Sequence, residues 1–64
     1  MTDYRVYLIG GDDHIFAAEN IEAADDQAAI AMAEHLCAGQ PGCRGFEVWE
    51  RARQVHRYWR EEAA

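Results

Sequence analysis

The stretch "ADDQAAIAMAEHLCAG", residues 24–39, has the spacing of an amphipathic helix. Asp25 is a suitable N-cap, and Asp26 adds negative charge at the positive end of the helix dipole. Gly39 stands where a left-handed C′ residue belongs, and Pro41 prevents the helix from continuing. The apolar positions that share one helix face are Ala29, Ile30, Ala33, Leu36 and Cys37.

Strand-like segments flank this helix on both sides. The segment at 4–9 is short and rich in aromatic and β-branched residues, and the others lie at 14–23, which has fewer such residues, 45–50 and 53–59. The cluster "GGDD" at residues 10–13 joins the first two segments as a hairpin turn. Arg51 and Ala52 would form a two-residue turn between the last two, although such turns favour Gly or Asn.

The element order ββαββ predicts an α+β fold with a four-stranded antiparallel sheet and one helix on one face. The sheet order 2-1-3-4 makes every neighbouring pair antiparallel and allows a right-handed crossover through the helix. We expect residues 1–64 to form a single domain, with residues 61–64 as a frayed tail.

Because one helix covers only one face of a sheet, the other face is the most informative feature of the sequence. Period-2 alternation directs the following residues toward the helix: Tyr4, Val6, Leu8, Ile15, Phe46, Val48 and Val55. It directs these residues away from it: Tyr7, Ile9, Phe16, Trp49 and Tyr58. The second face is therefore aromatic, whereas a sheet face in contact with water is normally polar.

The chain is small and acidic, which makes several classes of protein improbable. Its 64 residues leave little room for an enclosed substrate pocket beside a core, so we expect no enzymatic activity and no cofactor. The net charge of −6 repels phosphate backbones and anionic lipid. Residues 1–43 carry −7, whereas residues 44–64 carry +1, so only the C-terminal part could attract nucleic acid.

The sequence contains no apolar run of membrane-spanning length, and its N-terminus lacks the basic residues of a signal peptide. We therefore expect a cytoplasmic protein without a membrane partner. In that compartment Cys37 and Cys43 would be thiols, with Cys37 as a small core residue, although a disulfide between them is geometrically possible.

Three segments, "YRVYLIGGDDHI", "ADDQAAIAMAEHL" and "FEVWERARQV", resemble a group of short bacterial proteins of unknown function. The pattern of the group is Y-R-x-Y, then D-G-H-I, then D-D-x-x-A-I on a helix, then v-E-x-W-q-G-x-R, and the resemblance covers most of the chain. The sequence departs from the pattern at Arg51, where the group has Gly, and in the longer loop "CAGQPGC". The resemblance implies a small α+β domain and no particular reaction.

The candidate ligand sites are weak. Residues 10–16, "GGDDHIF", lack the pattern of a phosphate or calcium loop, and Gly and Asp there are typical of a turn. Asp12, Asp13 and His14 could hold a divalent ion or a small ligand at the surface. The four soft ligands His35, Cys37, Cys43 and His56 lack zinc-site spacing. No nucleophile and base are evident, and we expect His56 to pair with Glu47 across two strands.

The aromatic face predicts a non-enzymatic protein-interaction module, with a homodimer as the simplest assembly. The candidate interface is Tyr7, Ile9, Phe16, Trp49 and Tyr58. The alternative is single-stranded nucleic-acid binding, for which interleaved Arg and aromatic residues are typical. The residues for that alternative are Arg53, His56, Arg57, Tyr58 and Trp59.

Overall fold

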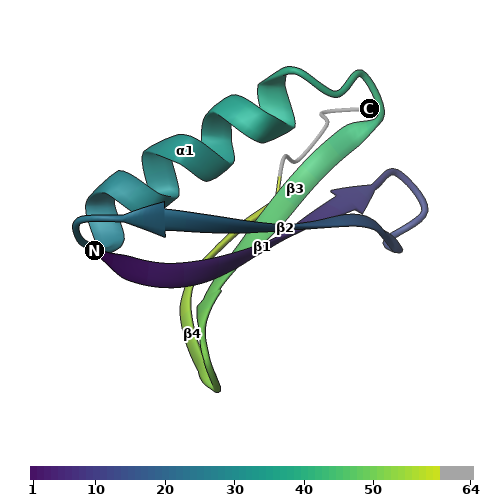
Figure 1. Cartoon of the computed structure of the whole chain (residues 1–64). Helices are drawn as coiled ribbons and strands as arrows, with labels where there is room; N and C mark the ends of the chain where they lie inside the picture. The colour runs from purple at the N-terminus through teal and green to yellow at the C-terminus, as the bar shows by residue number, and fades with distance from the viewer. Residues whose placement is uncertain (60–64) are drawn as a thin grey trace.

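The computed structural model describes residues 1–59, in which four strands and one helix follow the order ββαββ (Figure 1). The predicted tail at 61–64 lies outside these residues. The elements are β1 (Thr2–Gly10), β2 (Ile15–Ala23), α1 (Asp26–Ala38), β3 (Cys43–Glu50) and β4 (Arg53–Trp59).

The strands form one antiparallel sheet with the order β2-β1-β3-β4, which confirms the predicted topology. Helix α1 lies across one face of the sheet and contacts β1, β2 and β3 (Figure 1). Among residues 1–59, no element packs on the opposite face, and no helix is long and apolar enough to span a membrane.

The hydrophobic core lies between the sheet and α1. The buried cluster consists of Tyr4, Val6, Leu8, Ala23, Ala29, Ala33, Cys37, Cys43, Phe46 and Val48. The helix contributes small side chains at its closest approach, and Ile30 and Leu36 pack at the margin. The predicted helix-facing residues belong to this cluster, or pack against it in the case of Val55, with the single exception of Ile15.

The two ends of α1 differ in how well the sequence predicts them. Asp25 caps the N-terminus as expected, because its side chain accepts a 2.9 Å hydrogen bond from the Ala28 amide. The prediction of a left-handed Gly39 is wrong, since its φ is −79°. The chain instead leaves the helix through a turn over residues 40–43, in which the Cys43 amide donates to the Gln40 carbonyl.

The expectation of two free thiols is also wrong, because Cys37 and Cys43 form a disulfide. The turn after α1 brings the two Cα atoms to 5.4 Å, within the range that a disulfide requires. The bond joins the end of the helix to the start of β3 inside the core. Closing so short a loop contributes about 2 kcal/mol in the chain-entropy model.

A β-bulge in β2 changes which side chains face the helix. Leu8 lies opposite Ala17, but the next residue, Ile9, lies opposite Ile15, so Phe16 is the extra residue. Ile15 consequently shares the face of Ile9 and is 54% exposed. Its predicted position in the core is therefore wrong.

A second bulge, at Val55 in β4 between Gln54 and His56, has the same effect. It places Tyr58 opposite Phe46, and the two rings stack with centroids 5.4 Å apart. Tyr58 thus lies on the helix side of the sheet rather than on the opposite face. His56 also lies on the helix side, with its ring 6.0 Å from that of Phe46.

The turn between β3 and β4 contains a strained residue. Arg51 has a φ of 56°, in the left-handed region, and Ala52 has a negative φ. Glycine adopts a positive φ at much lower cost than arginine, and a two-residue hairpin with one positive φ favours glycine first.

Replacing Arg51 with glycine is therefore expected to raise the free energy of unfolding by about 1 kcal/mol. Urea denaturation at one fixed protein concentration measures the change. Ala52→Gly is the matched control and should lower stability slightly, because it only adds freedom to the unfolded chain. Equal effects of the two substitutions would contradict the prediction.

Candidate functional site

The sheet face opposite α1, here called the open face, is the main candidate site. Its side chains come from all four strands and mix aromatic, aliphatic and charged groups. It includes Arg5, Tyr7, Ile9, Ile15, Glu47, Trp49, Arg57 and Trp59, and the same register also places Asp3, Ala18, Asn20, Glu22 and Gln54 on it. A shallow depression in this face is lined by Arg5, Tyr7, Ile15, Glu47 and Trp49, with Arg51 from the neighbouring turn.

The structure retains part of the predicted interface and changes the rest. Tyr7, Ile9 and Trp49 lie on the open face as expected. Tyr58 does not, and Phe16 lies against Gly10, where an added Cβ would be 3.4 Å from its ring. Alternation along β1 puts that side of Gly10 toward the core, with Leu8.

The two bulges bring replacements onto the open face. Ile15 takes the place of Phe16, and Trp59 takes that of Tyr58. One residue in the sequence does indicate the position of Trp59, namely Gly45 on the neighbouring strand. Gly45 lies opposite Trp59, and a Cβ at Gly45 would be 2.8 Å from the Trp59 ring. A glycine in a strand interior commonly marks such a close approach.

Ile9 is the buried centre of the open face. It is only 2% exposed although it does not belong to the core cluster under the helix. Its neighbours across the strands are Ile15 and Gly45, and the Trp59 ring lies over Gly45. This second, smaller apolar cluster gives the open face a hydrophobic middle.

Polar contacts fix the side chains on either side of this middle. Trp49 Nε1 donates a 2.8 Å hydrogen bond to Glu47, whose other carboxylate oxygen lies 3.6 Å from Arg57 Nε. Glu47 therefore pairs with Arg57, and the predicted pairing of Glu47 with His56 is wrong. The Arg5 guanidinium lies over the Tyr7 ring, with its carbon 5.6 Å from the centroid.

The residues of the nucleic-acid alternative do not form one surface. His56 and Tyr58 lie on the helix side, whereas Arg57 and Trp59 lie on the open face. Both arginines of this group are engaged within the chain: Arg57 with Glu47, and Arg53 with two carboxylates. A nucleic-acid strand could not contact all five side chains from one side, and the paired arginines offer little charge to phosphate.

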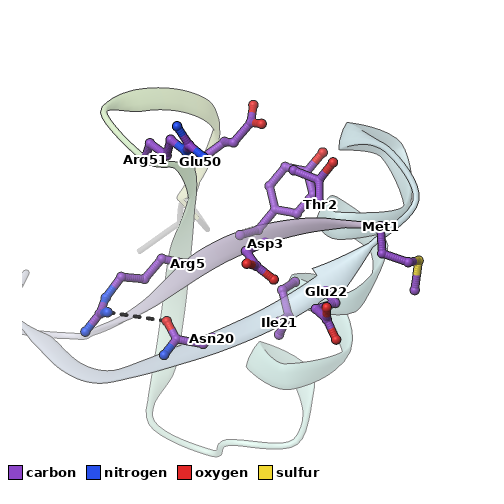
Figure 2. A pocket seen from close by; sticks show the side chains of 10 residues that line it. Met1, Thr2, Asp3, Arg5, Asn20, Ile21, Glu22, Glu50 and Arg51 are labelled. Carbon is purple, nitrogen blue, oxygen red and sulfur yellow. Dashed lines mark hydrogen bonds between the residues drawn. The ribbon is translucent and has the colours of Figure 1, made fainter.

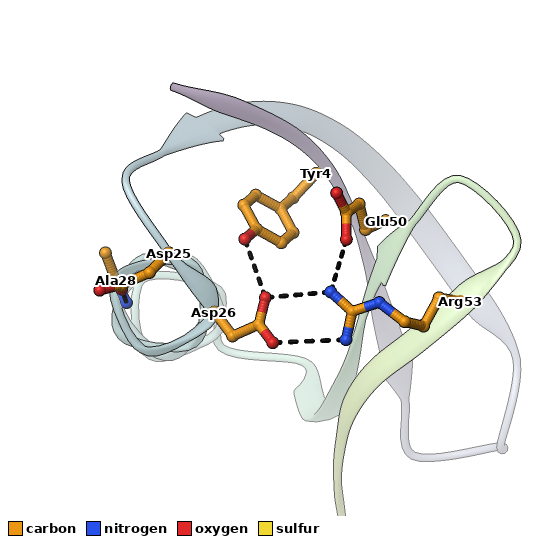
Figure 3. A network of polar contacts seen from close by, with 6 residues as sticks. All are labelled: Tyr4, Asp25, Asp26, Ala28, Glu50 and Arg53. Carbon is orange, nitrogen blue, oxygen red and sulfur yellow. Dashed lines mark hydrogen bonds and ion pairs between the residues drawn. The ribbon is translucent and has the colours of Figure 1, made fainter.

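Arg53 belongs to a polar network that the sequence analysis missed (Figure 3). Its guanidinium donates to both carboxylate oxygens of Asp26, at 3.2 and 3.3 Å, and to Glu50. The Tyr4 hydroxyl donates to Asp26 at 2.9 Å. The network joins the first turn of α1 to β1 and to the β3–β4 hairpin, so its role is to hold the helix on the sheet.

The network also sets the protonation of its members. The hydrogen bonds from Arg53 and then Tyr4 hold the pKa of the Asp26 carboxyl below its ordinary value. Burial, and then the hydrogen bond to Asp26, raises the pKa of the Tyr4 hydroxyl. Asp26 is thus a charged carboxylate whose two oxygens already accept hydrogen bonds from Arg53 and Tyr4. A general base instead needs an oxygen that is free to accept a proton and a pKa near the working pH.

A second, larger groove lies between the N-terminal end of β1, the C-terminal end of β2 and the tip of the β3–β4 hairpin (Figure 2). It forms because β1 pairs with β3 only from Arg5 onward, and the hairpin then diverges from it (Figure 1). Arg5 donates to Asn20 across its floor at 3.3 Å. The groove is open, and acids and arginines line its walls. Among residues 1–59, those that line it include no nucleophile in contact with a base.

Four of the residues considered as metal ligands contact one another, as the pairs Asp12–His14 and Cys37–Cys43. The "GGDD" segment is a turn as expected, with Asp13 at φ 66° and the Asp13 amide bonded to the Gly10 carbonyl. Asp12 pairs with His14 at 3.0 Å, and hydrogen bonds from His14 lower the pKa of the Asp12 carboxyl. The disulfide removes Cys37 and Cys43 as thiolate ligands. Within residues 1–59, no three His, Cys, Asp or Glu side chains lie close enough to hold an ion.

Comparisons with family models, with curated proteins and with solved structures found no match to this chain. The resemblance to the group of short bacterial proteins therefore stays a prediction, and the inference of function rests on the open face itself.

Proposed function

We propose that the protein is a non-enzymatic interaction module that self-associates through its open face. The observation that carries the proposal is an apolar centre, Ile9 with Ile15 and Trp59, on a face that no described element covers. Aromatic residues and arginine are enriched at protein interfaces, and energetically dominant residues gather at their centres. Tyr7 and Trp49 extend this centre, and charged groups surround it.

A second copy is the partner that the small size of the chain favours. A domain of 64 residues buries a modest fraction of its surface, so that association is one of the usual sources of additional stability. Two sheets that pack face to face with their strands nearly aligned cover the exposed side chains of both apolar centres, Ile15 and Trp59, at once. Among the described residues, neither the depression nor the groove holds a nucleophile beside a base, which supports a binding role over catalysis.

The Cys37–Cys43 disulfide bears on where such a module acts. Disulfides persist mainly in oxidising compartments. We therefore expect the protein to work in a more oxidising environment than the cytoplasm that the composition suggested.

Ile15→Asp tests the proposal because Ile15 is 54% exposed and its substitution leaves the core intact. Placing a carboxylate at the centre of the dimer interface is expected to weaken self-association at least about 30-fold. Sedimentation equilibrium and native mass spectrometry over a range of concentrations measure the effect. The wild-type chain should be a dimer at the upper end of that range.

Met32→Asp is the matched control. Met32 is 41% exposed on α1, so the substitution introduces the same charge in place of a comparably exposed apolar side chain, but away from the open face. It should leave the dimer unchanged. A wild-type chain that stays monomeric at every concentration, or equal dissociation by the two substitutions, would overturn the proposal.

A further inference from the structure

We infer that the two-fold axis of the proposed homodimer runs parallel to the strands, so that β2 of each copy lies over β4 of its partner. The inference rests on the proposed self-association and adds the orientation of the second copy. In this orientation Ile15 contacts the partner's Trp59. Arg51 contacts the partner's Asp3 and Glu22.

The open face changes in character along its strands. Asp3 and Glu22 lie opposite one another at one end, and both are exposed. No cation in residues 1–59 lies within ion-pair distance of either carboxylate. Ile9 and Ile15 lie opposite one another at the other end. The length of β1 between Asp3 and Ile9 separates this acidic end from the apolar end by roughly 20 Å, at about 3.4 Å per residue.

A two-fold axis perpendicular to the strands does not suit this gradient, because it reverses one sheet relative to the other. If the axis passes through the middle of the open face, it places the acidic end over the partner's apolar end. The carboxylates of Asp3 and Glu22 then lose water without gaining a cation, which is costly. If the axis passes through the apolar end, the two copies extend in opposite directions and leave Tyr7 uncovered.

An axis parallel to the strands keeps like ends together and exchanges the two edges of the sheet. It passes between the central strands β1 and β3 and brings β2 over the partner's β4. Ile15 and Trp59 lie on these edge strands, in one row that runs through Ile9 and Gly45, and are 54% and 38% exposed. Each Ile15 therefore meets the partner's Trp59, and the contact occurs twice. Because the two sheets twist with the same hand, the partner's β2 stays in line with β4.

The charges at the acidic end favour the same orientation. Arg51 is exposed at the tip of the β3–β4 hairpin, and no carboxylate of residues 1–59 lies within ion-pair distance of it. It lines the same groove as Asp3 and Glu22, but the hairpin diverges from β1 and holds it apart from both (Figure 2). Exchange of the edges brings Arg51 toward these two acids of the partner. Opposite charges then meet where the copies would otherwise repel one another.

Arg5 lies in the row between the acidic end and the middle of the open face. Its guanidinium lies over the Tyr7 ring and donates to Asn20, and it is opposite Trp49 in the pairing of β1 with β3. Because the axis runs between these two strands, Arg5 lies over the partner's Trp49, where a cation–π contact can form. The Arg5 charge thus stays beside the acidic end in both copies and partly offsets it.

An exchange of charge between Arg51 and Asp3 tests the orientation. Arg51→Glu and Asp3→Lys should each weaken the homodimer about tenfold, because each turns two attractive contacts into repulsive ones. An equimolar mixture should form a heterodimer about as tight as the wild type, since one contact is then native and the other has its charges exchanged. Native mass spectrometry with one variant labelled with 15N measures the proportion of heterodimer.

Glu19→Lys replaces Asp3→Lys in the control mixture. It changes the net charge equally, but Glu19 lies opposite Val6, on the helix side of the sheet. Alone, it should leave the homodimer as tight as the wild type or tighter. Mixed with Arg51→Glu, it should form the heterodimer only in a proportion close to the statistical one.

The orientation is overturned if Arg51→Glu and Asp3→Lys together form no more heterodimer than the control mixture. The proposed function still stands in that case if Ile15→Asp dissociates the dimer. A wild-type chain that stays monomeric at every concentration would overturn both.

Discussion

Phe46→Ala is expected to lower the free energy of unfolding by about 3–5 kcal/mol, the largest effect of any single truncation in this chain. Phe46 is the largest of the fully buried side chains and is 1% exposed. Its ring lies under α1 on one side and stacks with Tyr58 on another. The substitution leaves a cavity and also removes the aromatic contact that holds β4 to the core.

A loss of this size is comparable to the whole stability of the domain. At about 0.05–0.15 kcal/mol per residue, 64 residues give roughly 3–10 kcal/mol. The variant should therefore be substantially unfolded at room temperature or melt far below the wild type. Circular dichroism during heating, at one fixed protein concentration, measures the difference.

Phe16→Ala is the control for the loss of a phenyl ring as such. Phe16 is 47% exposed at the bulge in β2, so its truncation should cost well under half as much. Similar losses at both positions would show that the core does not lie under α1 as described.

Gly45→Ala should lower the free energy of unfolding by about 2–3 kcal/mol although it adds a single methyl group. A Cβ at Gly45 would lie 2.4 Å from the Tyr58 carbonyl oxygen and 2.8 Å from the Trp59 ring. The first of these atoms is backbone, so β4 itself must move away from β3. The variant should lose both stability and the cover that Trp59 gives to the open face.

The two tryptophans, Trp49 and Trp59, report this change directly, since both lie on the open face. We expect a red shift of the fluorescence maximum and a lower midpoint in urea. Gly42→Ala is the matched control, because nothing lies within 4 Å of a Cβ there and it should be nearly neutral. If Gly42→Ala destabilised the chain as much as Gly45→Ala, the close approach of β4 would be refuted.

The sequence by itself determined the elements, their order in the sheet and most of the core. The helix face from Ala29 to Cys37 and the apolar positions of β1 and β3 follow from periodicity, which is set by side chains a few residues apart. The Asp25 cap and the "GGDD" turn are equally local. The order 2-1-3-4 agrees with the chain path, because it makes every neighbouring pair antiparallel and lets the connection through the helix cross over with the usual right hand.

Only the tertiary structure decided which residues form the open face. A bulge inserts one residue and exchanges the faces of everything beyond it, and nothing in the local pattern of β2 or β4 fixes its position. Packing against the neighbouring strand fixes the position of each bulge, because it stacks Tyr58 on Phe46 and leaves Ile15 exposed. The disulfide and the network around Asp26 likewise depend on where the helix lies on the sheet, which residues distant in sequence determine together.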